Sequence, residues 1–298
     1  MSYCIELADT PHQSGSRTLN RLLIFTAAFL FSTGGVAIKA CALTSWQVAG
    51  FRSGIAAVVM LIAVPESRRG WNRLTLAAAV AYAATLVSFV AANKLTTSAN
   101  AIFLQSTAPL YMLFLSPLVL KERIRRLDAA VVAAVAAGAF LLLRGSAEAG
   151  RGAAPGNLIA IFSGFAWAWT MTALRWMGTR GSSVSVVTLG NLVAFAGCLP
   201  MALSEPLRPS PADLAVLGYL GVFQIALAYI CLTRSIRHVR AIEAATLLLV
   251  EPVFNPVWSW LLRNERPGPA VLAGGAIIVL AAFSGTWLQA SGKSAAGT

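Results

Sequence analysis

The stretch PLYMLFLSPLVLKER at 109–123 returns 143 positions later as PVFNPVWSWLLRNER at 252–266. Both copies begin with proline, carry a serine at the same place (Ser116 and Ser259) and end in a Glu-Arg pair. Apart from the charged end, each copy is strongly apolar, which is typical of a buried or membrane-spanning helix. The sequence therefore contains two related halves, and the fold is expected to repeat.

The composition places both halves in a membrane. Of the 298 residues, 57% are hydrophobic and 11% are charged, and the mean hydropathy is +0.72, whereas a soluble domain has about 25% charged residues. Lys and Arg outnumber Asp and Glu by 23 to 11, but the long apolar runs exclude a soluble nucleic-acid-binding protein. Those runs are also too long for the strands of an outer-membrane barrel. The expected fold class is an all-α, polytopic membrane protein.

Apolar stretches of about 20 residues, the length that spans a bilayer, predict ten transmembrane helices. With five in each half, the second copy enters the membrane upside down, which gives two inverted repeats. We expect a disordered N-terminus at 1–20, repeats at 21–150 and 151–290, and a tail at 291–298. The predicted helices are 22–40, 46–64, 74–93, 99–120, 127–143, 157–174, 184–203, 212–233, 241–262 and 270–288.

The distribution of basic residues predicts the orientation. With the N-terminus in the cytoplasm, 15 of the 23 Lys and Arg residues fall in cytoplasmic segments, seven fall in outer segments, and Arg52 lies within the predicted helix 46–64. Cytoplasmic loops are enriched in Lys and Arg. The sequence therefore predicts a multi-pass protein of a bacterial-type inner membrane with both termini, and hence the tail, in the cytoplasm.

Three segments resemble the EamA-type proteins of the drug/metabolite transporter superfamily: Asn100–Arg123, its partner Ala244–Arg266, and Gly50–Ser53. The predicted helix 22–40 departs from that family, with Phe31-Ser32-Thr33-Gly34 where a Trp-Gly pair is common. The resemblance implies two five-helix repeats and a secondary transporter that exports small metabolites, such as amino acids. An uncoupled facilitator, a multidrug or metabolite exporter of another substrate class, and a membrane-embedded sensor or interaction protein are the alternatives.

Two prolines mark the predicted helices 99–120 and 241–262 as kinked. Proline removes a backbone N–H and frees the carbonyl four residues earlier, so Pro109 exposes the Gln105 carbonyl and Pro252 exposes that of Leu248. Freed carbonyls inside a membrane are tolerated when they are buried in protein or line a wet cavity. We expect these repeat-related kinks to serve gating; a packing kink is the alternative.

Charged residues within a membrane are costly and usually functional. Arg52 and Glu251 lie near the middle of their predicted helices. We expect them to form an intramembrane ion pair; a substrate or gate contact, and proton coupling through Glu251, are alternatives. Lys39, Lys94 and Arg175 lie near helix ends, where long side chains reach the interface.

Polar and aromatic residues at helical spacing mark faces that line a substrate cavity or pack against neighbouring helices. A cavity lined by such residues suits small amphiphilic solutes. The candidates for the cavity are Tyr82, Phe89, Asn100, Thr107, Tyr111, Trp167, Trp169, Gln224, Tyr229, Glu251, Asn255 and Trp258.

No motif for an enzyme or for a bound cofactor occurs. The sequence has no GxxxxGK[ST] loop, no HExxH and no GxSxG, and its two histidines, His12 and His238, form no metal motif. We therefore expect a non-enzymatic protein without metal or cofactor, whose partners are a small-molecule solute and the lipid bilayer. A face of small residues on the predicted helix 127–143 suits bundle packing or a dimer contact, so a monomer and a homodimer are both consistent with it.

Overall fold

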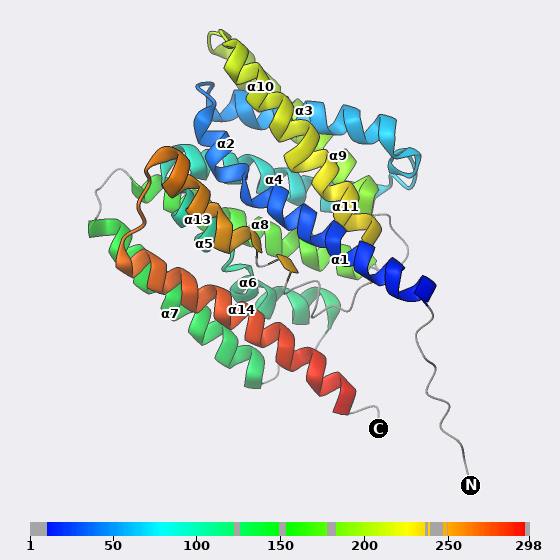
Figure 1. Ribbon diagram of the computed structural model, residues 1–298, viewed down its shortest axis with the longest axis vertical. Helices are drawn as coiled ribbons and strands as arrows, with labels where there is room; N and C mark the ends of the chain where they lie inside the picture. Colours follow the sequence, from blue (N-terminus) through cyan, green and yellow to red (C-terminus); the bar gives the residue numbers. More distant parts are fainter. Residues whose placement is uncertain are drawn as a thin grey trace.

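In the computed structural model, every regular element of the described chain is a helix (Figure 1). The described residues are 11–121, 126–148, 153–177, 183–235, 238, 247–248 and 250–295. The all-α fold class is thus confirmed. The elements are α1 (Pro11–Ser32), α2 (Gly34–Ala40), α3 (Ser45–Ala63), η1 (Pro65–Arg68), α4 (Arg73–Leu95), α5 (Ser98–Gln105), α6 (Ala108–Leu115), η2 (Ser116–Leu120), α7 (Arg126–Glu148), α8 (Ala154–Met177), α9 (Ser183–Ser204), α10 (Pro211–Tyr219), η5 (Leu220–Leu227), α11 (Ala228–Ser235), α13 (Val250–Arg263) and α14 (Pro269–Ala295).

The elements follow the ten predicted helices, with differences at ends and breaks. The first predicted helix is α1 plus α2, the fourth is α5, α6 and η2, and the eighth is α10, η5 and α11. Helix α1 already begins at Pro11, so residues 11–20 are helical rather than disordered, and α14 continues to Ala295, into the expected tail. The ninth predicted helix is described as a continuous helix only from Val250.

Side-chain caps fix where several helices begin. Thr44 and Gln47 form a capping box at α3, and Ser210 and Asp213 form another at α10. Each box satisfies backbone N–H groups that have no partner within the helix. These polar turns separate apolar runs, which is why α3 and α10 start within a few residues of the predicted positions.

The packing of the helices follows a pseudo-two-fold axis. Each of three helices packs against its own counterpart from the other half: α3 against α9, α5 against α13, and α7 against α14. Other contacts occur in exchanged pairs, so that α4 contacts α8 as α11 contacts α1. Helices α1 and α14 begin and end at the same end of the bundle (Figure 1), as an even number of crossings requires. This arrangement supports two inverted repeats.

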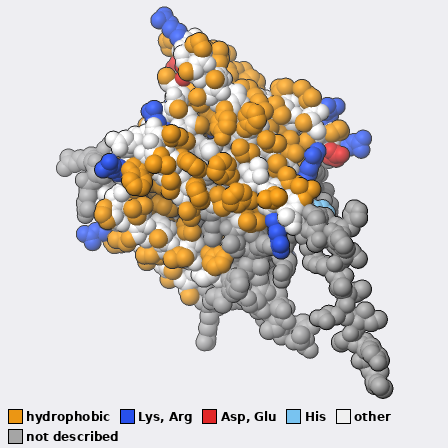
Figure 2. All heavy atoms as spheres, viewed as in Figure 1, with side chains coloured by type: hydrophobic (Ala, Val, Ile, Leu, Met, Phe, Trp, Pro, Cys, Tyr) orange, Lys and Arg blue, Asp and Glu red, His pale blue; other side chains and the backbone are white. Residues whose placement is uncertain are grey.

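The outer surface is apolar, as a surface in contact with lipid must be. Figure 2 shows a face covered by hydrophobic side chains with Lys and Arg at its periphery. Of the described hydrophobic residues, Ile62, Leu118 and Leu262 expose more than half of their surface. Within the described chain, five helical segments are long and apolar enough to cross a membrane: Thr18–Ala40, Ser45–Ala63, Arg73–Leu95, Ser183–Ser204 and Pro211–Ser235. The protein is therefore a multi-pass membrane protein.

Candidate substrate-binding site

Arg52 lies near the middle of α3 and is 1% exposed. Its Nη2 donates to the Leu86 carbonyl of α4 at 3.1 Å, and its Nη1 donates to Gln224 Oε1 of η5 at 3.4 Å. Its Nε has no hydrogen-bond partner. A guanidinium carries five N–H donors and stays charged inside proteins, so this buried cation is only partly satisfied.

The π-helical turn η5 places Gln224 beside Arg52. In a π-helix the hydrogen bonds run from i to i+5, so residues five apart lie almost above one another. Gln224 and Tyr229 are five apart and consequently share the face of this span that looks towards the bundle interior. Gly221 allows η5 to approach α3, because a Cβ there would lie 2.8 Å from the Arg52 carbonyl oxygen.

Two tyrosines and a phenylalanine cover this region. The rings of Tyr82 and Tyr229 meet edge to face at 5.4 Å, and Phe31 of α1 meets Tyr229 at 4.9 Å. Tyr82 is 1% exposed, and its hydroxyl lies near the side chains of Tyr229 and Asn191 but makes no hydrogen bond of normal geometry. Arg52 lies within electrostatic range of both tyrosines. We call Arg52, Tyr82, Gln224 and Tyr229, together with the Leu86 carbonyl, the Arg52 site.

Glu251 lies in the first turn of α13 and near Tyr229. Among the described residues no ion pair joins it to Arg52. The ion pair expected from the sequence is therefore not formed in this structure. Arg52 donates hydrogen bonds to neutral acceptors instead. Tyr229 lies near both Arg52 and Glu251.

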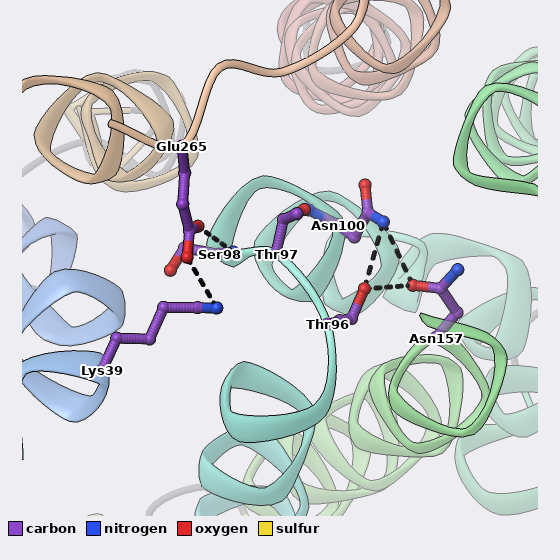
Figure 3. A network of polar contacts seen from close by, with 7 residues as sticks. All are labelled: Lys39, Thr96, Thr97, Ser98, Asn100, Asn157 and Glu265. Atoms are coloured by element: carbon purple, nitrogen blue, oxygen red, sulfur yellow. Dashed lines mark hydrogen bonds and ion pairs between the residues drawn. The ribbon is translucent and has the colours of Figure 1, made fainter. Parts of the chain in front are cut away.

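A second polar cluster closes one end of the bundle (Figure 3). Lys39 Nζ at the end of α2 pairs with Glu265 Oε1 at 2.7 Å, just beyond α13. The other oxygen of Glu265 accepts from the Ser98 N–H at the start of α5, at 3.1 Å. The sequence analysis explained Lys39 only by the reach of a long side chain to the membrane interface. That explanation is incomplete, because Lys39 has a specific acidic partner, Glu265, which belongs to the repeated sequence motif.

Two amide side chains and one hydroxyl continue this cluster. Asn100 Nδ2 donates to Thr96 Oγ1 at 3.1 Å and to Asn157 Oδ1 at 3.2 Å, and Thr96 Oγ1 donates to Asn157 at 2.8 Å. Asn100 therefore joins the α4–α5 turn to α8 and lies away from the Arg52 site. We call the seven residues drawn in Figure 3 the Lys39 network: Lys39, Thr96, Thr97, Ser98, Asn100, Asn157 and Glu265.

The α2–α3 loop at the same end is held by two further side chains. Lys94 donates to the Cys41 carbonyl, and Asp213 accepts from the Ala42 N–H at 2.6 Å. Burial raises the pKa of the Cys41 thiol above its ordinary value, which keeps this thiol protonated. The described cysteines Cys41, Cys198 and Cys231 are all free and buried.

The first predicted kink is a complete break of the helix. Residues 106–107 separate α5 from α6, directly before Pro109, whose side chain lies outside the described part. Thr107 is buried and donates to the Leu104 carbonyl at 2.6 Å. A Cβ on Gly164 of α8 would lie 2.9 Å from the Gln105 carbonyl oxygen. The carbonyl freed by Pro109 therefore faces the backbone of α8.

The second predicted kink lies at the edge of the described part of its helix. Pro252 is buried in α13. Before Val250 only residues 247–248 are described, and both are helical, so the hydrogen bond that Pro252 would remove falls outside the described residues. The proline inside α13 is Pro256, which the sequence analysis did not single out.

Of three remaining candidates, one packs with residues of the Arg52 site and two lie against α1 and α2. Trp167 of α8 packs in the same apolar cluster as Tyr82 and Tyr229. Trp258 of α13 donates from Nε1 to Ser32 Oγ at 3.0 Å and meets Phe29 edge to face. Asn255 is fully buried, and neither of its amide atoms has a partner.

Three other candidates belong to packing or to the surface. Phe89 is buried in the main apolar cluster. Tyr111 donates to the Ile161 carbonyl at 3.3 Å and packs against Phe165. Trp169 is 40% exposed, on the outer side of α8. Trp169 therefore does not face the centre of the bundle.

The structure also brings in residues that the sequence analysis missed. The hydroxyl groups of Thr33 and Tyr219 lie 2.7 Å apart, which joins the break between α1 and α2 to α10. Cys198 of α9 lies within electrostatic range of Arg52. A Cβ on Gly34 would lie 2.9 Å from Gln224 Nε2. The sequence analysis noted the segment at 31–34 only for its departure from the family's Trp-Gly pair and did not assign it to a site.

The small-residue face of α7 packs inside the bundle. A Cβ on Gly138 would lie 2.7 Å from the carbonyl oxygen of Gly274 in α14. Close approach of helices through small residues is common in membranes, so the contact made here is intramolecular. Among the described residues, no three His, Cys, Asp or Glu side chains gather where they could hold a metal ion.

Comparison with known proteins gives a family and an architecture. The model of the EamA-like transporter family matches residues 19–144 and 154–285. A pseudopaline exporter, CntI, of Pseudomonas aeruginosa strain UCBPP-PA14 is 28% identical over 273 residues, which cover 88% of this chain and 94% of that protein. The protein of the same name from strain PAO1 is 27% identical over the same length. A solved structure described only as a crystal structure of a protein aligns with a TM-score of 0.63 and 20% identity, covering 91% of this chain and 98% of that one.

Proposed function

This chain belongs to the EamA-like transporter family, and on that basis we propose that it is a secondary transporter that exports amino acids or related small amphiphilic metabolites across the bacterial inner membrane. Its relatives named as exporters support export of a small molecule. Amino acids are proposed because the site at the centre combines a cation with aromatic and amide side chains, which suits small amphiphilic solutes.

The observation that supports transport most strongly is the place of the Arg52 site between the two repeats. The first repeat contributes Arg52 and Tyr82 through α3 and α4. The second repeat contributes Gln224 and Tyr229 through η5 and α11. Transporters built from inverted repeats bind substrate where the repeats meet, and they alternate access by rocking one repeat against the other.

The Lys39 network supplies a second element of this proposal. It joins α2, α5, α8 and the turn after α13 at one end of the bundle. By the distribution of Lys and Arg, this end is the outer one, with both termini in the cytoplasm. We therefore assign the described conformation as one in which the outer end is closed over the Arg52 site.

Counterflow uptake into proteoliposomes tests the function directly. Purified protein is reconstituted with unlabelled amino acid inside, and entry of radiolabelled amino acids is measured with and without an imposed proton gradient. Saturable uptake without a gradient would support a carrier for that amino acid. Strict dependence on the gradient would instead require a coupled mechanism and would assign Glu251 as a candidate proton site. If no amino acid enters, the amino-acid assignment fails.

A further inference from the structure

We propose that the Arg52 site recognises a carboxylate group of the transported molecule, with Arg52 Nε–H and the Tyr82 hydroxyl as donors. This inference rests on the proposed transport function and names the chemical group that the site selects. Its basis is a buried cation that has no acidic partner among the described residues, beside a buried hydroxyl that makes no hydrogen bond of normal geometry.

The first step concerns the free-energy cost of burying the charge of Arg52 without an ion-pair partner. Burying a charge in an apolar environment is unfavourable unless the charge is paired and hydrogen-bonded. Arg52 is 1% exposed and contacts two neutral acceptors, one of them at the long distance of 3.4 Å. An incoming anion would remove this cost, so the site favours a negatively charged group.

The second step concerns the size and charge of that group. Among the residues that define the Arg52 site, Arg52 is the only basic one, so the site carries one positive charge. A substrate group with one negative charge would balance it. The Nε–H on one edge of the guanidinium is buried and makes no hydrogen bond. A planar carboxylate fits the planar donors of arginine in a bidentate manner, whereas a doubly charged phosphate would leave a charge unpaired.

The third step concerns Tyr82, which lies on α4 one turn before Leu86, whose carbonyl accepts from Arg52. The hydroxyl of Tyr82 therefore lies on the same side of α4 as the guanidinium. Gly190 of α9 backs the ring, since a Cβ there would lie 2.5 Å from Tyr82 Cδ1. The ring is thus held in place, and its unpartnered hydroxyl is available to the second carboxylate oxygen.

The test measures ligand stabilisation of the purified full chain with matched compounds. Thermal unfolding is recorded with L-phenylalanine, L-methionine and L-leucine, and with the carboxamide of each. We expect the carboxylates to raise the unfolding temperature and the carboxamides to bind roughly ten- to hundred-fold more weakly, the effect of losing a charge-assisted hydrogen bond. Equal stabilisation by acid and amide would overturn the proposal, and so would a panel in which no carboxylate binds.

Two variants keep the test decisive if one of them folds poorly. Arg52→Gln is expected to lose roughly ten- to hundred-fold in affinity for the carboxylates. Tyr82→Phe removes only the hydroxyl and keeps the ring that packs against Tyr229 and Gly190, so its fold should be retained while carboxylate affinity falls about ten-fold. Arg144→Gln, an exposed arginine of α7, is the matched control and should bind like the parent protein.

The outcomes separate this inference from the proposed function. If carboxylates bind through Arg52 but no amino acid is transported, the site is retained and the amino-acid assignment fails. If amino acids are transported equally well as acids and as amides, and Arg52→Gln does not change their affinity, the transport assignment is retained and the carboxylate site is rejected. Unchanged carboxylate affinity in Tyr82→Phe would remove the hydroxyl from the site.

Discussion

Lys39 and Arg52 are two basic residues of the first repeat, and they differ in the partners that surround their charges. Lys39 lies at the end of α2 and forms an ion pair with Glu265 at 2.7 Å. Arg52 lies inside α3, is more deeply buried, and has two neutral acceptors and an unpartnered Nε. Among the described residues, the more costly charge is therefore the one that has no counter-ion.

This difference follows from position and points to different roles. At the end of the bundle, the turn after α13 brings an acidic side chain to α2, so the chain itself can neutralise Lys39. At the centre, only helix faces surround Arg52, and these carry aromatic rings, an amide and a carbonyl. We infer that the Lys39 network holds the end of the bundle together, while the Arg52 site is completed by an anion from outside the chain.

The largest expected effect comes from giving Arg52 an internal partner. Gln224→Glu would place a carboxylate where the amide oxygen now lies, 3.4 Å from Nη1. We expect this variant to be stabilised by about 1–3 kcal/mol, since a charge already buried gains its counter-ion. Transport of carboxylates should fall at least ten-fold, because the internal group competes with the substrate. Thermal unfolding and counterflow uptake measure the two effects.

A neutral substitution serves as the control for this variant. Gln224→Leu removes the amide without adding a charge, so it should neither stabilise the protein nor block the site electrostatically. If Gln224→Glu transported carboxylates as fast as the parent protein, the contrast between the Lys39 network and the Arg52 site would be wrong. In that case Arg52 would be a structural residue, as Lys39 is.

The sequence predicted the membrane fold well, because apolar runs and the 143-residue offset depend on composition and order alone. It also singled out Arg52, Tyr82, Gln224 and Tyr229, since depth within a predicted helix and polarity can be read from the chain. Their neighbours could not be predicted in the same way. The rotation of each helix about its axis is set by packing, and it joined Arg52 to Gln224 rather than to Glu251.

Local deviations from α-helical geometry explain further differences. A period of 3.6 residues places Gln224 and Tyr229 on different faces, whereas the π-helical turn η5 brings them together. The same period assigned Trp169 and Asn100 to a cavity. In the structure Trp169 is on the surface, and Asn100 bonds Thr96 and Asn157. Asn157 belongs to another helix, so a helical projection of one element could not place it beside Asn100.

The next effect in size concerns Asn100. Replacing it with alanine removes two buried hydrogen bonds and leaves Asn157 and Thr96 with fewer partners, which should cost about 1–3 kcal/mol of stability. We expect unfolding at a lower temperature and an unchanged affinity for carboxylates. A lower affinity in a variant of normal stability would instead place Asn100 at the substrate, as the sequence had predicted.

A smaller effect is expected when the Lys39–Glu265 pair is broken. The two side chains are 16% and 23% exposed, so the pair is partly screened by solvent and contributes roughly 0.5–1 kcal/mol. Glu265→Gln should lower stability by this amount and retain an acceptor for the Ser98 N–H. Exchanging the charges, with Lys39→Glu and Glu265→Lys together, should recover most of the loss. A double variant as unstable as the sum of its single variants would show that the pair contributes nothing.

The smallest effect is expected on the lipid-facing side of α8, where Trp169 is 40% exposed. Trp169→Leu should change the free energy of unfolding by less than about 0.5 kcal/mol, because an apolar surface residue is replaced by another. Uptake by proteoliposomes should also be unchanged. Trp167, two residues away, packs in the cluster with Tyr82 and Tyr229 and is the matched comparison, since Trp167→Leu should impair uptake. The two tryptophans differ mainly in the face of α8 that they occupy. Equal loss of uptake in both variants would show that transport depends on α8 as a whole. The distinction between the central Arg52 site and its surroundings would then be wrong.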